Sequence, residues 1–353
     1  MDNTDNTLLL ILNPEAGLRY ARKFLPEIIA LFTDYGYQCL VFVTEKRGDA
    51  TEFVKKYGER VKCIVSIGGD GTFNETVTGV MQAGLNIPVG YIPAGSTNDF
   101  ANSLHLPSDI MNAAKNIMEG EPVSIDVGRF QQRYFTYVAS FGAFTRASYE
   151  TPQNVKNALG HLAYILEGMK SLASIRPEHV KLIADGRTYE RELLFGAVSN
   201  STSLGGVLTL DPDVVDMNDG KFEIMLVHMP NSAIELNEIL TAIASKQYEC
   251  SMIDFIRTER AEIFASPDMD WSLDGEHQKG SERIEDTDQR DPWRRKVNTN
   301  TEKHPSGCFC MFLIYFSSLS IRRKKGAGDS VLIYRIRRQI SCCGYPPWRR
   351  SGN

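Results

Sequence analysis

The sequence of 353 residues has no long hydrophobic run and no strong excess of charge of one sign. Because no apolar stretch reaches the roughly 20 residues that cross a bilayer, a membrane-spanning helix is not expected. The first five residues carry two aspartates where a secretory signal would be basic, so we expect no signal peptide. The net charge of −5 argues against a nucleic-acid-binding protein.

Cysteine and histidine are sparse, at seven and six residues, and neither shows the spacing of zinc ligands. Cys39, Cys63 and Cys250 stand far apart in apolar or helical surroundings, which is typical of reduced, buried thiols. We therefore expect a cytoplasmic protein.

The glycine-rich turns of the chain fit neither Gly-x-x-x-x-Gly-Lys-Ser/Thr nor Gly-x-Gly-x-x-Gly, which excludes the P-loop and dinucleotide fingerprints.

A hydrophobic content of 42% is typical of a soluble globular protein, and the length predicts two domains. Before Asp126, apolar runs alternate with segments of helical spacing. The expected strands are 8–12, 39–43, 61–67 and 89–92, and the expected helices are 21–35, 49–57, 73–83 and one from 99. This order predicts a parallel sheet with helices on both faces, where ligands bind beyond the carboxyl ends of the strands.

After Asp126 the apolar runs are short and rich in β-branched and aromatic residues, which predicts a mainly antiparallel β domain. Helical patterns near 155–172 and 233–244 interrupt it. We predict domains at 1–126 and 127–285. From 286 to 353 the composition shifts to cysteine, tryptophan and arginine, so we treat this segment as an anomalous tail.

Two glycine-rich turns each follow a predicted strand. The first is Gly68-Gly69-Asp70-Gly71-Thr72, and the second is Pro93-Ala94-Gly95-Ser96-Thr97-Asn98-Asp99. Such turns present backbone N–H groups at a helix N-terminus, where phosphate binds well. A carboxylate beside phosphate would repel it unless a divalent cation stood between, so the aspartates predict a nucleoside triphosphate with Mg²⁺. A plain structural turn is the alternative for the first motif alone.

Four segments together resemble the diacylglycerol-kinase-like lipid kinases, the family that includes bacterial diacylglycerol kinases and sphingosine kinases. They are Asn13-Pro14-Glu15-Ala16-Gly17, Gly68 to Glu75, Gly95 to Ala101, and Leu273-Asp274-Gly275-Glu276. The resemblance implies an α/β nucleotide domain like that of NAD kinases and phosphofructokinases, followed by a mainly antiparallel β-sandwich domain. It places the active site in the cleft between them.

The resemblance also implies roles for individual residues. ATP would be bound by Asn13, Pro14, Glu15, Ala16, Gly17, Thr44, Gly69, Asp70, Gly71, Thr72, Phe73, Asn74, Glu75 and Ser96. A catalytic Mg²⁺ would lie among Asp70, Asp99 and Asp126, and a second, structural Mg²⁺ would be bound by Asp216, Asp219 and the backbone carbonyl of Lys221. Glu276 is the leading candidate for the base that accepts the proton of the lipid hydroxyl, and Asp70 is the second.

We therefore expect a lipid kinase that uses ATP and Mg²⁺, is peripheral to the membrane, and converts diacylglycerol to phosphatidic acid. Sphingoid bases and phosphatidylglycerol are alternative acceptors, and an NAD kinase or an inactive nucleotide-binding protein are the rival functions. The expected partner is a lipid substrate at the membrane surface. The oligomeric state stays open, with a homodimer as one option.

The resemblance ends after Glu276, and the tail shows no sustained periodicity. Our hypothesis is a shifted reading frame that begins near Asp286, which sequencing the locus again would test. Zinc binding is disfavoured because the four tail cysteines lack paired Cys-x-x-Cys spacing. Binding of the basic and apolar residues to an anionic membrane is a minority alternative.

Overall fold

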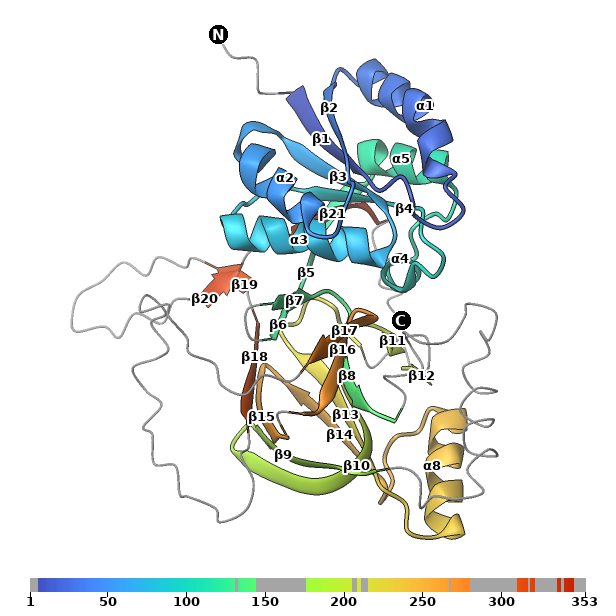
Figure 1. Ribbon diagram of the computed structural model, residues 1–353, viewed down its shortest axis with the longest axis vertical. Helices are drawn as coiled ribbons and strands as arrows, with labels where there is room; N and C mark the ends of the chain where they lie inside the picture. Colours follow the sequence, from blue (N-terminus) through green and yellow to red (C-terminus); the bar gives the residue numbers. More distant parts are fainter. Residues whose placement is uncertain are drawn as a thin grey trace, which may run out of the picture.

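The computed structural model describes residues 6–130, 133–143, 176–204, 208–210, 215–266 and 268–279, and the backbone of four strands between 310 and 345. An α/β part lies above an antiparallel β part (Figure 1). This arrangement confirms the predicted fold class. The helix expected near 155–172 lies outside the described residues.

The α/β part is built on a six-stranded sheet with the order β2-β1-β3-β4-β21-β5. Its strands are β1 (Thr7–Leu12), β2 (Gln38–Val43), β3 (Cys63–Gly68), β4 (Val89–Pro93), β5 (Glu121–Ile125) and β21 (Ile340–Tyr345). The first four are parallel to their neighbours, as the alternation of strands and helices predicts. Strand β21 pairs parallel with β4 and antiparallel with β5.

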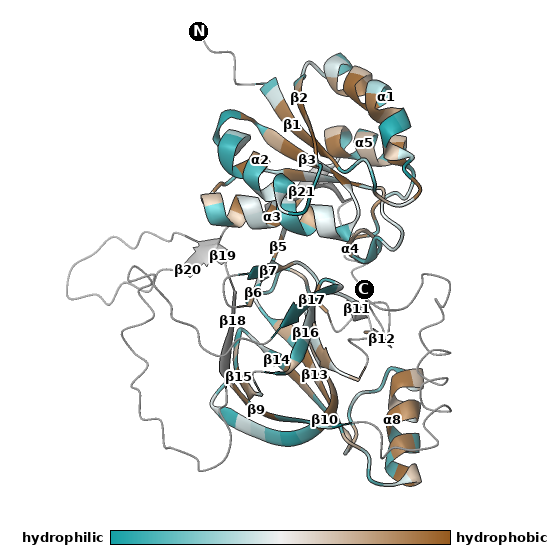
Figure 2. Cartoon of the chain, viewed as in Figure 1, coloured by the Kyte–Doolittle hydropathy of each residue, from teal (hydrophilic) through white to brown (hydrophobic). Residues whose placement is uncertain are grey.

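Helices cover both faces of this sheet. They are α1 (Ala21–Asp34), α2 (Asp49–Tyr57), α3 (Asp70–Ala83), α4 (Asp99–Ser103) and α5 (Ile110–Glu119), with a short 3₁₀ helix, η2 (Gly58–Arg60). Successive residues of β1 point to opposite faces, so Leu8 and Leu10 share a core with α1 and α5, while Leu9 and Ile11 share one with α2 and α3. Burial on both faces explains why β1 is a continuous apolar run, and Figure 2 shows its hydrophobic colour beside helices of mixed colour.

The β part is an eleven-stranded sheet whose pairings are antiparallel. Its strands are β6 (Gly128–Phe130), β7 (Arg133–Phe135), β8 (Val138–Gly142), β9 (Glu178–Ala184), β10 (Arg187–Ser199), β13 (Phe222–His228), β14 (Ile253–Thr258), β15 (Arg260–Ala265), β16 (Asp270–Leu273), β17 (Glu276–Lys279) and β18 (Cys310–Phe316). The first half of β10 pairs with β9, and its second half pairs with β8 and β13. Trp271 fills the core, with its ring 4.6 Å from that of Phe130 and 4.8 Å from that of Phe141.

Smaller elements complete the described chain. Helix α8 (Ala233–Ser245) confirms the helix predicted at 233–244. The pairs β11 (Ser203–Leu204) with β12 (Leu208–Thr209), and β19 (Ser318–Ser320) with β20 (Arg335–Arg337), form two small sheets. No helix among the described residues is long and apolar enough to cross a bilayer.

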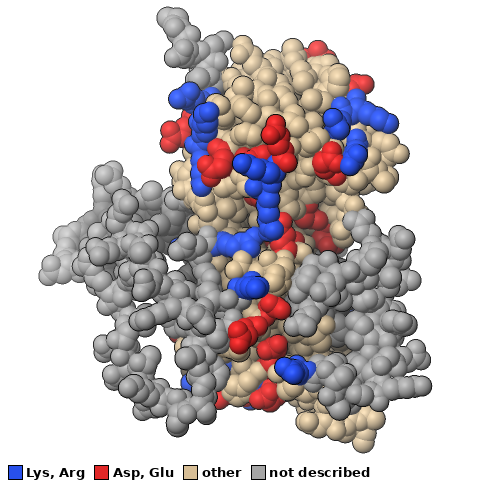
Figure 3. Space-filling view, viewed as in Figure 1, with Lys and Arg blue, Asp and Glu red and all other residues tan. Residues whose placement is uncertain are grey.

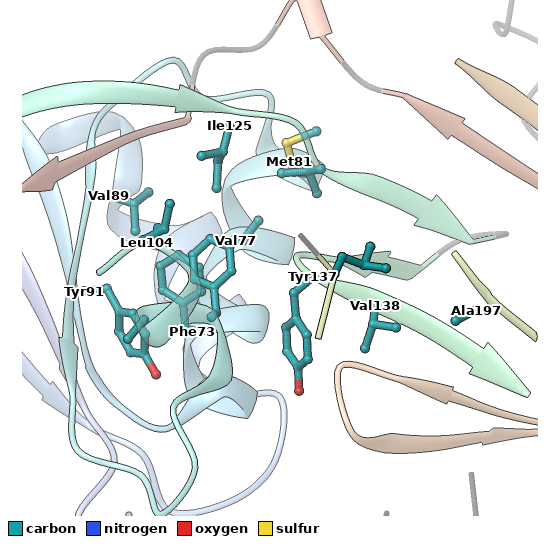
Figure 4. Close-up of a cluster of buried hydrophobic side chains, with 14 of the residues drawn as sticks. Phe73, Val77, Met81, Val89, Tyr91, Leu104, Ile125, Tyr137, Val138 and Ala197 are labelled. Carbon is teal, nitrogen blue, oxygen red and sulfur yellow. The ribbon is translucent and has the colours of Figure 1, made fainter. Parts of the chain in front are cut away.

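The two parts share one hydrophobic core. Phe73 and Val77 of α3 belong to the same cluster as Tyr137, Val138 and Ala197 of the β part (Figure 4). Such a continuous core fixes helix α3 relative to the β strands.

The tail contributes backbone to both sheets. Strand β18 pairs with β15 and β6, and β21 lies between β4 and β5. The boundaries 1–126, 127–285 and 286–353 stay predictions. The shifted reading frame concerns the gene and stays a hypothesis.

Candidate active site

Three segments that are far apart in the sequence meet at the carboxyl edge of the parallel sheet. Asn13, directly after β1, donates its backbone N–H to the carbonyl of Ile67 at 2.9 Å and its side-chain amide to Thr72 Oγ1 at 3.0 Å. Thr44, directly after β2, donates its backbone N–H to the carbonyl of Leu12 at 2.9 Å. The strand ends therefore bring three predicted ATP-binding segments together, as expected for a parallel sheet.

The two glycine turns touch each other through their backbones. Ala94 N–H donates to the carbonyl of Gly68 at 2.7 Å. A Cβ atom on Gly95 would lie 2.5 Å from Cα of Gly69, and one on Gly17 would lie 2.5 Å from the carbonyl oxygen of Ala94. Side chains at these glycines would push the turns apart.

Asp70, the first residue of α3, joins the two turns. Its carboxylate accepts the backbone N–H of Asp99 at 3.0 Å and that of Phe100 at 3.2 Å, and so caps the short helix α4. Burial, followed by the negative charge of Asp99, raises the pKa of Asp70 from 3.8 to about 6, although these hydrogen bonds oppose the rise.

No positive charge is among the described groups that shift the pKa of Asp70: burial and the Asp99 carboxylate raise it, and hydrogen bonds lower it. A divalent cation beside Asp70 and Asp99 would supply that charge, and carboxylate oxygen is a ligand that Mg²⁺ accepts. The donor set therefore fits Mg²⁺ chemically. Within the described ranges, however, no three Asp, Glu, His or Cys side chains are grouped closely enough to form a metal site by themselves. A Mg²⁺ ion that is bound by two carboxylates, and takes its remaining ligands from phosphate and water, would fit this finding.

Glu276 lies against the first glycine turn, although it comes more than 200 residues later in the chain. It begins β17, directly after the two-residue turn of the β16–β17 hairpin. A Cβ atom on Gly71 would lie only 3.3 Å from Glu276 Oε1. The Glu276 carboxylate also pairs with the guanidinium groups of Arg47 and, at 3.2 Å, Arg133. The fold thus brings Glu276 to the predicted phosphate-binding turn.

Charged side chains of both signs are interleaved where the upper and lower parts of the molecule meet (Figure 3). Arg47 lies between β2 and α2, and Arg133 begins β7, so Glu276 connects the two parts through its ion pairs. The local sequence does not identify either arginine as part of the site, because their shared partner Glu276 is more than 140 residues away from each of them.

Other residues predicted to bind ATP have side chains that face the protein. Phe73 is fully buried and stacks on Phe100 at 4.8 Å. Asn74 donates its side-chain amide to the carbonyl of Tyr134 at 3.0 Å and to Asp274 at 2.6 Å. These side chains hold α3 in place.

Glu75 accepts the backbone N–H of Gly48 at 2.8 Å, at the start of α2. Burial raises the pKa of this carboxyl. For Phe73, Asn74 and Glu75 the backbone is the group that a nucleotide could contact.

The outer part of the predicted nucleotide site is accessible. Glu15, Gly17 and Ser96 are exposed, Pro14 is half-buried, and Ala16 is buried. Exposed loop backbone next to the paired glycine turns can accept a phosphate or a ribose.

Asp126 contacts the loop that carries the predicted structural metal site. It is buried, and its carboxylate accepts the backbone N–H of Gly220 at 2.7 Å. In that loop, Asp216 accepts the N–H of Asn218 at 3.0 Å, and Asp219 accepts the N–H of Lys221 at 2.9 Å. The roles of these residues as metal ligands stay predictions.

Arg257 lies next to this loop. Its guanidinium contacts Asp219 at 2.8 Å and the buried Glu223 at 3.2 Å. Part of the charge of Asp219 is therefore balanced by an arginine. Burial raises the pKa of Glu223 to about 8, despite Arg257.

Comparison with known proteins agrees with this architecture. Residues 7–130 match the model of the diacylglycerol kinase catalytic domain, and residues 138–282 match that of the YegS C-terminal NAD kinase beta sandwich-like domain. Over 270 residues, the chain is 34% identical to a diacylglycerol kinase of Bacillus subtilis strain 168, covering 76% of this chain and 89% of that relative. A diacylglycerol kinase of Staphylococcus carnosus strain TM300 is 33% identical, with 76% and 88% covered.

Solved structures show the same fold. A structure from Bacillus anthracis strain Sterne superposes with a TM-score of 0.68 at 23% identity and covers 97% of both chains. A diacylglycerol kinase structure from the same strain gives a TM-score of 0.62 at 20% identity, also with 97% of both chains covered. With its sequence, its two matched domains and its fold in agreement, this chain belongs to the diacylglycerol kinase family of lipid kinases.

Proposed function

We propose that this protein transfers the γ-phosphate of ATP to the free hydroxyl of diacylglycerol, with Mg²⁺, at a membrane surface. The observation that carries the proposal is the position of the Glu276 carboxylate against Gly71 of the first glycine turn. That position supports a base beside the place where a phosphate would bind.

The paired glycine turns would bind the phosphates of ATP through backbone N–H groups. Asn13, Thr44 and Ser96 surround the same edge of the sheet, and the N-terminus of α3 adds a favourable dipole. Phosphoryl transfer depends mostly on positioning and on neutralising charge, which such a rigid backbone site can supply.

Mg²⁺ would be held by Asp70 and Asp99, with Asp126 contributing through the neighbouring loop. When bound, the ion would neutralise phosphate charge and polarise the transferred group. Asp216, Asp219 and the carbonyl of Lys221 would hold a second, structural ion.

Glu276 is the better of the two candidates for the base. Both carboxylate oxygens of Asp70 already accept backbone N–H groups, so Asp70 holds the turns and α4 together. The Glu276 side chain is partly exposed at 30%, and Arg47 and Arg133 orient it. A carboxylate oriented in this way can accept the proton of an alcohol when that alcohol attacks phosphate.

Diacylglycerol is the proposed acceptor because the similar proteins from Bacillus subtilis and Staphylococcus carnosus carry that name. The test is a transfer assay with γ-labelled ATP and Mg²⁺, using mixed micelles that contain diacylglycerol, sphingosine or phosphatidylglycerol, and NAD in solution. We expect label in phosphatidic acid. Label in another lipid or in NADP would replace the proposed acceptor, and ATP binding without any transfer would favour an inactive nucleotide-binding protein.

A further inference from the structure

The turn of the β16–β17 hairpin contains a buried carboxylate, that of Asp274. Asp274 and Gly275 form a two-residue turn, with φ values of 50° and 80°, as Asp-Gly hairpins commonly do. Such turns normally face solvent, yet Asp274 is only 4% exposed. A charged carboxylate without partners would be unstable in this environment. Its hydrogen-bond donors therefore explain how it is accommodated.

Five donors converge on the Asp274 carboxylate. One oxygen accepts the backbone N–H of Thr136 at 2.6 Å and its hydroxyl at 2.8 Å. The other oxygen accepts the backbone N–H groups of Tyr137 and Val138, each at 3.0 Å. The fifth donor is the Asn74 amide at 2.6 Å. Burial raises the pKa of Asp274, and the hydrogen bonds from these residues oppose that rise.

These bonds connect three elements that would otherwise be independent. Thr136 to Val138 lead into β8 of the β part, and Asn74 lies in α3, one turn after the first glycine turn. Asn74 also donates to the carbonyl of Tyr134, so a single amide connects α3 to both β7 and the hairpin turn. Movement of the hairpin relative to α3 would break this buried network.

We propose that Asp274 is a positioning residue that holds Glu276 at the phosphate turn; this inference rests on the proposed function of Glu276 as the base. Glu276 follows Asp274 by two residues, and its carboxylate lies 3.3 Å from where a Cβ atom on Gly71 would be. Asp274 does not itself reach the reacting atoms. It fixes the distance between the hairpin and α3, and that distance sets the position of the base.

Asp274→Asn is the variant that tests this role, because it keeps the shape and changes the hydrogen bonding. The amide nitrogen cannot accept the N–H groups that face one carboxylate oxygen, so the hairpin should shift. A misplacement of about 1 Å is enough to lower kcat by about 100-fold. We expect this loss with less than about a threefold change in the Kd of ATP.

The matched control is Asp185→Asn. Asp185 and Gly186 form the same kind of turn between β9 and β10, with φ values of 49° and 75°. Asp185, however, is exposed, and its carboxylate accepts a hydrogen bond from the Thr258 hydroxyl. We expect its kcat to equal that of the wild type.

The decisive experiment is a double-mutant cycle on kcat with Glu276→Gln, measured with labelled ATP at high enzyme concentration. If Asp274 acts through Glu276, Asp274→Asn should change the residual rate of the Glu276→Gln protein by less than about threefold. An equal loss in both backgrounds, or no loss in the single variant, would overturn the positioning role while leaving the base assignment intact. A wild-type rate for Glu276→Gln alone would overturn both.

Thr136→Val is the second variant, for the case that Asp274→Asn does not fold. It removes only the hydroxyl that donates to Asp274 at 2.8 Å and keeps the buried β-branched shape. A loss of kcat that is present in the wild-type background and absent in the Glu276→Gln background supports the proposal. An unchanged kcat, or an equal loss in both backgrounds, contradicts it.

Discussion

At the scale of single residues, the site depends on carboxylates with different surroundings. Asp70 is half-buried and accepts two backbone N–H groups beside another acid, whereas Glu276 is partly exposed between two arginines. The same chemical group is thus given two tasks. Asp70 joins the glycine turns. Under the proposed function, Asp70 would also attract a cation, and Glu276 would accept a proton.

Asp70→Asn should remove a pH dependence from the stability of the protein without nucleotide and Mg²⁺. In the wild type the native state binds more protons than the unfolded state between pH 3.8 and about 6, so stability falls as pH rises through that range. The asparagine variant lacks this loss. Between pH 4 and pH 7 we expect the stability of the wild type to fall relative to that of the variant by about 3 kcal/mol at most. The N–H group that the asparagine amide cannot accept shifts the difference by the same amount at every pH.

Thermal denaturation at several pH values measures this difference. Millimolar Mg²⁺ should reduce it, since the ion would stabilise only the charged wild-type site. A difference in stability that does not change with pH would show that the folded protein does not raise the pKa of Asp70.

Arg47→Ala should disturb the base without changing the fold. Arg47 is exposed, and its guanidinium pairs with Glu276, so its loss leaves only Arg133 to orient the carboxylate. We expect kcat to fall by about tenfold, with a change in melting temperature of less than about 2 °C. The control is Lys55→Ala, which removes an exposed pair with Glu52 on α2 and should leave kcat unchanged. Equal rates for Arg47→Ala and the wild type would remove Arg47 from the site.

At the scale of elements, the glycine turns are the part that the sequence predicts best. Each turn follows a strand that is recognisable from its apolar run, and parallel strands place their carboxyl ends at one edge. The contacts of Asn74, Glu75 and Arg47 could not be predicted, because their partners belong to distant segments that only the folded chain brings together. A sequence motif predicts which turn binds phosphate, but not which of its side chains stabilise that turn.

Gly95→Ala should separate the two turns. The new Cβ would meet Cα of Gly69 at 2.5 Å, and backbone cannot move aside cheaply. We expect the affinity for ATP to fall by at least about tenfold, with a loss of about 1–3 kcal/mol in stability. The control is Gly36→Ala, where φ is 83° but no atom lies within 4 Å of the new Cβ. It should cost stability without changing ATP affinity.

At the scale of the whole molecule, one core runs from α3 into the β part. The hydrogen bond from Asn74 to Asp274 joins α3 to the β16–β17 hairpin. The sequence correctly predicts the α/β part and the antiparallel β part, because periodicity and strand length are local properties of the sequence. It does not predict the shared core, which depends on how α3 packs against Tyr137, Val138 and their neighbours (Figure 4).

Removal of residues 286–353 should destabilise the protein. Strand β21 lies between β4 and β5, and β18 lies between β15 and β6, so truncation exposes unpaired strand edges in both sheets. We expect a lower melting temperature and aggregation, measured by scanning calorimetry and light scattering. A truncated protein as stable as the full chain would show that these strands contribute nothing and would strengthen the hypothesis of a shifted reading frame.

The central claim is that this protein transfers phosphate from ATP to a lipid alcohol. In this account the glycine turns bind the phosphates, and Glu276 accepts the proton of the alcohol. Its most direct measurement is the rate of label transfer from ATP to diacylglycerol in micelles by the wild type and by Glu276→Gln, with ATP affinity determined for both. The account predicts transfer by the wild type, a rate lower by at least about 100-fold in the variant, and similar affinities. No transfer by the wild type, or equal rates for the two proteins, would contradict it.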